Sequence, residues 1–179
     1  MFSIMQENLP QDSLLRTYRG AVHPERWGKY GDCFTVIVDR AVSLAEFVLA
    51  FYTSPVFRFE RLLLHVFVSA SSSDAAALAL AEGSASSFAV WYAGERTATQ
   101  LLMCDRYERT RSWFRVVPMS GDKTALQFGS AIAAIRDSGS ARASLGAGFR
   151  LLLGFHVLYS KVLLLAAKAR VLKNARGGL

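Results

Sequence analysis

Cysteine is scarce in this sequence of 179 residues, which contains two, Cys33 and Cys104. Two cysteines that far apart form neither a disulfide framework nor the paired spacing of a zinc site. The three histidines, His23, His65 and His156, also stand singly, so the sequence shows no cluster of metal ligands. We therefore expect a protein without disulfides, metal or other cofactors, in a reducing cytoplasmic compartment.

The motifs that mark common enzyme classes are missing too. There is no glycine-rich phosphate loop, no dinucleotide-binding fingerprint and no Gly-x-Ser-x-Gly turn around a nucleophile. The first 13 residues include Glu7 and Asp12 and no basic residue before an apolar run, so a secretory signal is not expected. The apolar stretch near the C-terminus is interrupted by Arg150, His156 and Lys161, which argues against stable membrane insertion.

Acidic residues are absent from the last part of the chain. Residues 140–179 contain seven basic side chains and no acidic one, whereas residues 1–139 contain 14 of each sign. The seven are Arg142, Arg150, Lys161, Lys168, Arg170, Lys173 and Arg176. Such a segment can lie on an anionic membrane or bind an acidic partner. The favoured interpretation is a solvated outer helix face that ends in a frayed basic tail.

Hydrophobic residues make up 52% of the chain, enough for one domain with a substantial core. Residues 1–31 are mixed and polar, with interspersed proline and glycine, and predict an extended lead-in. Residues 32–172 carry the patterns of a single α+β domain, and residues 173–179 predict a flexible basic tail.

Serine residues mark where the first helices begin. The elements expected in this part of the chain are a strand at Phe34–Asp39 and helices at 43–52, 54–68 and 74–82. Ser43 and Glu46 have the spacing of a capping box, in which each side chain satisfies an amide at the helix start. Ser54 and Pro55 suit the cap and the first position of the next helix. Gly83 suits the C-terminal end of the third helix.

Residues 98–117 predict a β-hairpin at the centre of a sheet, preceded by a strand at Phe88–Glu95. With Tyr107–Thr110 as the loop, Met103 pairs with Phe114. One face of the hairpin is then mostly apolar and is the expected core face. It carries Thr99, Leu101, Met103, Asp105, Ser112, Phe114 and Val116.

Trp113 lies between Arg111 and Arg115 on the opposite face of the hairpin. Aromatic stacking beside cations is how single-stranded nucleic acids are bound. The chain before residue 140 is neutral overall, however, so it lacks the electrostatic footprint of a nucleic-acid-binding protein. We therefore expect a solvated sheet face and no nucleic-acid partner.

Lys123–Ile132 predicts the last strand, and the small residues around Gly129 on one of its faces indicate a closely packed neighbour. A long helix is expected at Leu145–Leu172, which contains no proline. Its predicted apolar face comprises Leu152, Phe155, Tyr159, Val162, Leu163 and Ala166. Helical projection places Lys161 and Lys168 on the opposite side.

The order strand, two short helices, antiparallel strands and long C-terminal helix resembles the helix-grip fold of the START-like (SRPBCC) superfamily. Four segments are also similar to those of a bacterial family in that superfamily with no assigned activity. They are Phe51-Tyr52-Thr53-Ser54-Pro55, Gln100-Leu101-Leu102-Met103-Cys104-Asp105, Arg111-Ser112-Trp113-Phe114 and Leu153-Gly154-Phe155-His156. The superfamily includes polyketide cyclases and lipid-transfer domains. The resemblance implies a curved antiparallel sheet that grips the long helix, although the count of about five strands is lower than usual there.

The resemblance also implies an apolar cavity between sheet and helix. The side chains expected at this site are Leu101, Met103, Asp105, Phe114, Phe128, His156 and Tyr159. Asp105 would be partly desolvated beside Met103, as a general acid or base requires, or it pairs with neighbouring groups at the end of the hairpin. His156 could orient a ligand carbonyl or transfer a proton, or it is a hydrogen-bonded structural histidine. The structural interpretation is favoured for both residues.

Three functions follow as hypotheses. The first is the binding of a small hydrophobic molecule without catalysis. The second is an enzyme of polyketide-cyclase type, in which Asp105 and His156 transfer protons. The third is a peripheral membrane or scaffold protein that acts through its basic C-terminal helix. The sequence does not indicate an oligomeric state.

Overall fold

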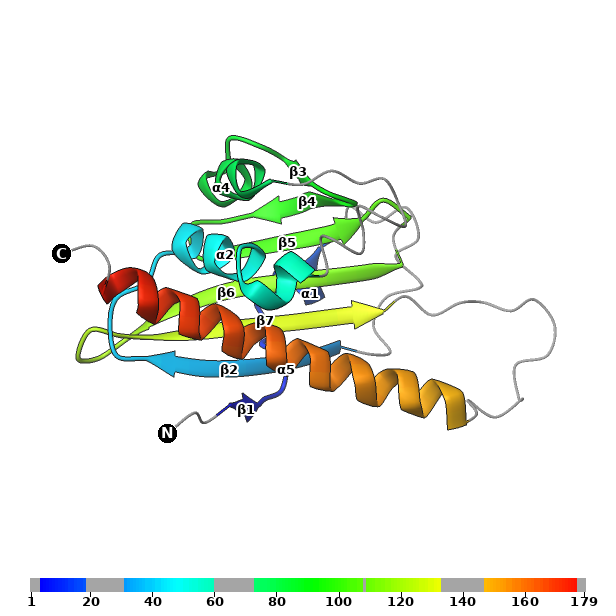
Figure 1. Cartoon of the computed structure of the whole chain (residues 1–179). Helices are drawn as coiled ribbons and strands as arrows, with labels where there is room; N and C mark the ends of the chain where they lie inside the picture. Colours follow the sequence, from blue (N-terminus) through cyan, green and yellow to red (C-terminus); the bar gives the residue numbers. More distant parts are fainter. Residues whose placement is uncertain (1–3, 19–30, 60–72, 108, 133–146, 177–179) are drawn as a thin grey trace.

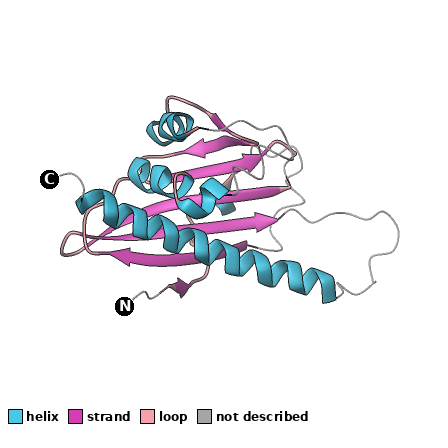
Figure 2. Cartoon of the chain, viewed as in Figure 1, coloured by secondary structure: helices cyan, strands magenta, loops and turns pink. Residues whose placement is uncertain are grey.

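The computed structural model describes residues 4–18, 31–59, 73–107, 109–132 and 147–176, with the backbone alone for residues 132, 147–155 and 176. It has an open, seven-stranded antiparallel sheet with helices on both faces (Figures 1 and 2). The long helix α5 (Ala147–Arg176) and α2 (Leu44–Tyr52) cover one face, and the short α1 (Leu14–Thr17) lies against the other. The predicted α+β class and the C-terminal helix are thus confirmed.

The sheet has more strands than the sequence indicated. The strands are β1 (Met5–Gln6), β2 (Gly31–Val38), β3 (Ser87–Phe88), β4 (Trp91–Arg96), β5 (Gln100–Asp105), β6 (Thr110–Met119) and β7 (Lys123–Ile132). Their order is β1-β2-β7-β6-β5-β4-β3. One additional strand is β1, in the expected lead-in. The other arises because Ala89, with a φ of 53°, turns the chain inside the strand expected at 88–95.

The serine and glycine caps predicted for the helices are present, whereas the Glu46 side chain of the predicted capping box forms an ion pair with Arg40. The Ser43 hydroxyl accepts a hydrogen bond from the amide of Glu46 at 3.1 Å, and the Ser54 hydroxyl accepts one from the amide of Phe57 at 3.2 Å. Gly83 ends α4 (Asp74–Glu82) in the left-handed conformation, with a φ of 81°. A helix begins at residue 55, as expected, but its predicted course to residue 68 lies outside the described residues beyond residue 59.

The central hairpin has the predicted faces and a different register. Met103 pairs with Ser112 rather than with Phe114, because the loop comprises residues 106–109 instead of 107–110. The carboxylate of Asp105 accepts a hydrogen bond from the amide of Arg109 at 2.6 Å and closes the loop there. The loop begins and ends one residue earlier than predicted, so the partner of each residue changes by two positions. Residues two apart on a strand share a face, so every cross-strand pair still consists of residues from the same predicted face.

The face expected to be solvated is buried instead. Trp113 is 0% exposed and Arg111 is 2% exposed, and the Arg111 guanidinium carbon lies 4.9 Å from the centre of the Tyr18 ring. The residues that cover this face come from the N-terminal segment, in which Leu14 and Leu15 pack against the strands. The expectation of water-exposed arginines beside an exposed Trp113 was therefore wrong. Its mixture of arginines and apolar residues suggested a solvent-exposed face, because the apolar segment that covers it is distant in the sequence.

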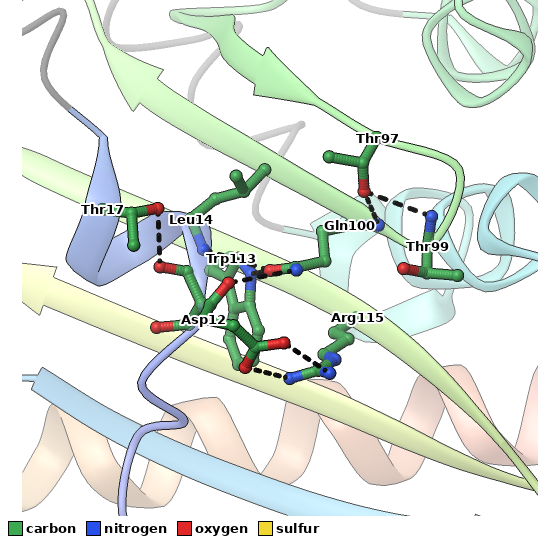
Figure 3. Close-up of polar contacts among 9 residues, drawn as sticks. Asp12, Leu14, Thr17, Thr97, Thr99, Gln100, Trp113 and Arg115 are labelled. Atoms are coloured by element: carbon green, nitrogen blue, oxygen red, sulfur yellow. Dashed lines mark hydrogen bonds and ion pairs between the residues drawn. The ribbon is translucent and has the colours of Figure 1, made fainter.

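Gln100 joins this N-terminal segment to the sheet (Figure 3). Its side-chain oxygen accepts hydrogen bonds from the Trp113 indole at 2.8 Å and from the Leu14 amide at 3.1 Å. Its side-chain nitrogen donates to the carbonyl oxygen of Asp12 at 3.2 Å. The carboxylate of Asp12 also accepts two hydrogen bonds of 2.9 Å from Arg115. These contacts join the segment to β5 and β6 and give the buried side chain of Gln100 its hydrogen-bond partners.

Gly129 provides a test of this packing. A β-carbon there would lie 2.7 Å from the Asp32 carbonyl oxygen and 3.0 Å from the Trp113 ring. Gly129→Ala should therefore lower the free energy of unfolding in urea by about 1–3 kcal/mol, as overpacking does. In Gly31→Ala, the nearest atom would be at 3.7 Å, so the control should stay within about 0.5 kcal/mol of the parent. Equal effects would contradict close packing at Gly129.

Helix α5 faces the sheet in a different rotation from the predicted one. Its buried line comprises Ser160, Leu163, Leu164, Ala167 and Val171. Val162, predicted to be buried, is 39% exposed. Lys168 donates a hydrogen bond of 2.7 Å to the carbonyl oxygen of Ile37, and the Lys161 nitrogen lies 5.3 Å from the centre of the Phe34 ring. Both lysines were expected on the solvent side.

A polar contact at the sheet edge accompanies this rotation. The two-residue β1 pairs with only part of β2, so carbonyl oxygens of β2 such as that of Ile37 need other partners. A lysine can reach such a group because its methylene stem lies along apolar surface, and its ammonium group then donates the hydrogen bond. The side chains of Leu152 and Phe155 lie outside the described part. The helix ends at Arg176, so residues 173–176 of the expected flexible tail are helical.

Candidate functional site

Three polar side chains meet on the helix-covered face of the sheet. Asp32 on β2 and Ser130 on β7 are cross-strand partners. They share a face with Phe34 and Phe128, which belong to the core under α2 and α5. His156 on α5 completes the group, with its Nε2 atom 2.7 Å from the Ser130 hydroxyl. We call these three residues the polar cluster.

The hydrogen bonds within the polar cluster have a defined direction. The Ser130 hydroxyl donates to Oδ1 of Asp32 at 2.6 Å, and the Ser130 amide donates to the same oxygen at 2.8 Å. A hydroxyl has one proton, so Ser130 accepts a hydrogen bond from Nε2 of His156. The same nitrogen lies 4.0 Å from Oδ2 of Asp32. Serine thus bridges histidine and aspartate.

This arrangement differs from that of a serine nucleophile. In a Ser-His-Asp triad, the histidine lies between the other two residues and accepts the serine proton. Here the proton of Ser130 points to Asp32, so His156 does not activate the hydroxyl. The cluster can position a polar group of a ligand, or transfer a proton through His156, and does not suit acyl transfer.

The cluster is buried at one end and accessible at the other. The side chain of Asp32 is 3% exposed, whereas that of His156 is 25% exposed. Ser112 on β6 lies beside Ser130 in the same row of the sheet and is half-buried. A molecule that approaches this end of the helical layer therefore meets His156 before it meets Asp32.

The structure groups most of the predicted site residues in one core. Leu101, Met103, Phe114 and Phe128 are buried there, and Tyr159 packs against them while remaining partly exposed.

Part of this core is filled by aromatic rings. The Phe51 ring of α2 lies 4.8 Å from the Phe114 ring and 4.9 Å from the Phe128 ring, measured between centres. The rings of Phe114 and Phe128 are 5.3 Å apart. The rings meet edge-to-face or tilted, and they fill the space beside Phe114 and Phe128.

Asp105 forms its hydrogen bond at the end of the hairpin and is not part of the polar cluster. Its carboxylate is engaged at the end of the hairpin with the amide of Arg109. This is the structural role that the sequence favoured for it. His156, by contrast, contacts Ser130 and approaches Asp32, so the structure gives this predicted residue polar neighbours that no sequence pattern had linked to it.

Sequence analysis missed Asp32 and Ser130 as site residues. The first strand was predicted from Phe34, whereas β2 begins at Gly31. Extending the alternation of Phe34, Val36 and Val38 backwards would have placed Asp32 on the core face. Ser130 lies between Phe128 and Ile132 in the strand that was predicted correctly. A polar residue on the apolar face of each strand was the available signal.

The cysteines belong to the opposite side of the sheet. Cys33 and Cys104 are buried, and neither forms a disulfide. Burial raises the pKa of the Cys33 thiol to about 12, and the negative charges of Glu7 and Asp32 add to this effect. A thiol with a raised pKa is a poor nucleophile near neutral pH, because the thiolate is the reactive form.

Other kinds of site find no support in the part of the chain that the structure describes. No group of three or more His, Cys, Asp or Glu side chains is placed to hold a metal ion among those residues. No helix within the described ranges is both long and apolar enough to cross a membrane. Trp113 is buried and is not available to stack on a base.

Comparisons of the chain with protein-family models, with curated proteins and with solved structures gave no match.

Proposed function

We propose that this chain is a cytoplasmic helix-grip protein that binds a small hydrophobic molecule between its sheet and α5, with His156 at the polar end of the ligand. The element order supports this proposal, since a strand, short helices, antiparallel strands and a long C-terminal helix follow one another. The strand β1 is an addition to that order. Both cysteines are thiols, which suits a reducing compartment.

The polar cluster is the observation that carries the proposal. Burying a carboxylate and a hydroxyl stabilises a fold less than burying apolar side chains of similar size. Asp32 and Ser130 nevertheless lie in the helix-covered layer, next to Phe34 and Phe128. Ligand sites combine an apolar lining with a few placed polar groups, and this arrangement has that character.

Proton transfer is a second candidate, favoured by the hydrogen bonds that connect His156 to Asp32 through one hydroxyl. A bound ketone such as 2-dodecanone would then exchange the hydrogens next to its carbonyl group for deuterium in D₂O. Mass spectrometry measures this exchange, and His156→Gln should abolish it.

The hypothesis of a peripheral membrane or scaffold protein has less support, because Lys161 and Lys168 of the basic helix contact the sheet.

Binding can be tested with Nile red, an uncharged dye that fluoresces in apolar surroundings. We expect saturable binding of one dye per chain to the folded protein. Ser112→Phe should weaken this binding by about tenfold or more, because the ring would occupy the half-buried position between Met103 and Ser130. The readout is the dissociation constant from fluorescence titration.

The matched control is the same substitution at Ser120, which is exposed in the turn between β6 and β7. Ser120→Phe should leave the dissociation constant unchanged, and both variants should keep the circular dichroism spectrum of the parent. Absence of saturable binding to the parent protein, or equal weakening by the two substitutions, would contradict the proposed site.

A further inference from the structure

A line of apolar side chains runs along the outer side of α5. Leu158 is 60% exposed and Val162 is 39% exposed, and Ala169 is exposed as well. Leu165 and Leu172 stand in the same line and are half-buried, because they also pack against the edge of the core. We call these five residues the outer seam.

The outer seam points away from the rest of the domain. Ser160, Leu164 and Ala167 of the buried line each lie two residues from a member of the seam, which is about half a turn around a helix. In the view of Figure 1, α5 lies in front of the sheet, and none of the described elements crosses over it. The rotation of α5 thus brings to the surface a side chain, Val162, that the sequence pattern had assigned to the core.

The spacing of the outer seam is that of a coiled coil. Its members follow one another at intervals of four, three, four and three residues, which is the alternation of d and a positions in a heptad. In the sequence, Phe155 and Leu151 continue this spacing towards the start of the helix. So narrow a line suits packing against one further helix. A helix that lies on a membrane instead buries an extended apolar face in the lipid.

The charged residues of α5 beside the outer seam are all basic. In the heptad, Lys161 and Lys168 occupy g positions and Lys173 occupies an e position, from which side chains reach a partner helix. Lys173 is exposed, and the other two place their charge along the same helix while they contact the sheet. Residues 140–179 contain no acidic residue. A second copy of α5 would therefore bring like charges together, whereas an acidic helix is complementary.

From this spacing and this charge we infer that the outer seam binds an amphipathic helix of another protein, with apolar a and d positions and acidic residues at its e and g positions. The apolar line of the partner covers Leu158 and Val162, and its carboxylates face Lys161 and Lys173. The surface lies on the side of α5 that faces away from the core, so the inference does not depend on a small-molecule ligand.

Two synthetic peptides test the inference on the full chain. Both are about three heptads long, with leucine at a and d. One has glutamate at e and g, and the other has lysine there. Fluorescence anisotropy of the labelled peptides should show saturable binding of the glutamate peptide. The lysine peptide should bind at least about tenfold more weakly, because its charges repel those of α5. Binding of neither peptide, or equal binding of both, would overturn the inference.

The combined substitution Leu158→Ala and Val162→Ala removes apolar surface from the seam. It should weaken binding of the glutamate peptide by about tenfold or more. Leu78→Ala is the matched control, because Leu78 is 42% exposed on a different helix, α4. This control should leave the dissociation constant unchanged. Equal weakening by the control and the double variant would contradict binding at the seam.

Lys173→Glu tests the charge at an exposed position and remains informative if the double alanine variant does not fold. It should weaken the glutamate peptide by about threefold or more and strengthen the lysine peptide. Lys123→Glu makes the same change in net charge on β7, where Lys123 pairs with Asp39, and should alter neither affinity. If both substitutions shift the affinities alike, binding is governed by net charge and the inference is wrong.

Two other occupants of the seam are distinguished by separate measurements. Self-association in analytical ultracentrifugation that the double alanine variant abolishes would assign the seam to a second copy and overturn the inference. Binding to phosphatidylcholine vesicles that contain phosphatidylserine, lost in the same variant and without binding of the glutamate peptide, would assign it to a membrane. We expect neither result.

Discussion

Trp113→Ala should lower the free energy of unfolding by about 3–5 kcal/mol, the cost of removing a large aromatic side chain from a core. Trp113 lies on β6 and is fully buried beneath the N-terminal segment. Its loss would leave a cavity against Leu15 and Gly129 and would remove one of the two hydrogen bonds to the Gln100 side-chain oxygen. Urea denaturation followed by circular dichroism measures the change.

Trp113→Phe separates the two contributions. It keeps most of the ring and loses the indole N–H, while the Gln100 oxygen still accepts from the Leu14 amide at 3.1 Å. We expect this variant to lose about 0.5–1.5 kcal/mol, the net value of a typical hydrogen bond. A cost below about 1 kcal/mol for Trp113→Ala would mean that the N-terminal segment does not cover this face of the sheet.

Leu164→Ala should cost about 2–5 kcal/mol, because it removes a fully buried side chain from the core under α5. Leu158→Ala is the matched control on the same helix. Leu158 is 60% exposed, so the same substitution there should change the free energy of unfolding by no more than about 0.5 kcal/mol. Equal effects in urea denaturation would mean that α5 meets the sheet through a different face.

The local elements of the fold were predictable because their causes are local. Ser43 and Ser54 cap helices through amides three residues away, and Gly83 ends α4 with its own backbone conformation. The faces of the hairpin follow from the alternation of side chains along a strand. Alternation does not determine register, however. Met103 pairs with Ser112 because Asp105 closes the loop on the amide of Arg109.

The burial of the second sheet face depended on residues far away in the chain. Gln100 contacts Leu14 across 86 positions, and no periodic pattern within the hairpin encodes such a partner. The small residue at Gly129 did predict a close neighbour, without indicating which segment supplies it. The rotation of α5 likewise involves distant partners, since Lys168 reaches Ile37 across 131 positions.

The sequence by itself determined the α+β class, the helix caps, the faces of the hairpin and the presence of a long C-terminal helix, and it singled out His156. The tertiary structure alone decided which groups His156 meets. Ser130 and Asp32 are separated by 98 positions in the chain, and Ser130 and His156 by 26. The pairing of β2 with β7 and the packing of α5 across both strands bring them together. Capping and alternation act between neighbours in the sequence, whereas the polar cluster exists only because distant strands share hydrogen bonds and a helix is buried against them.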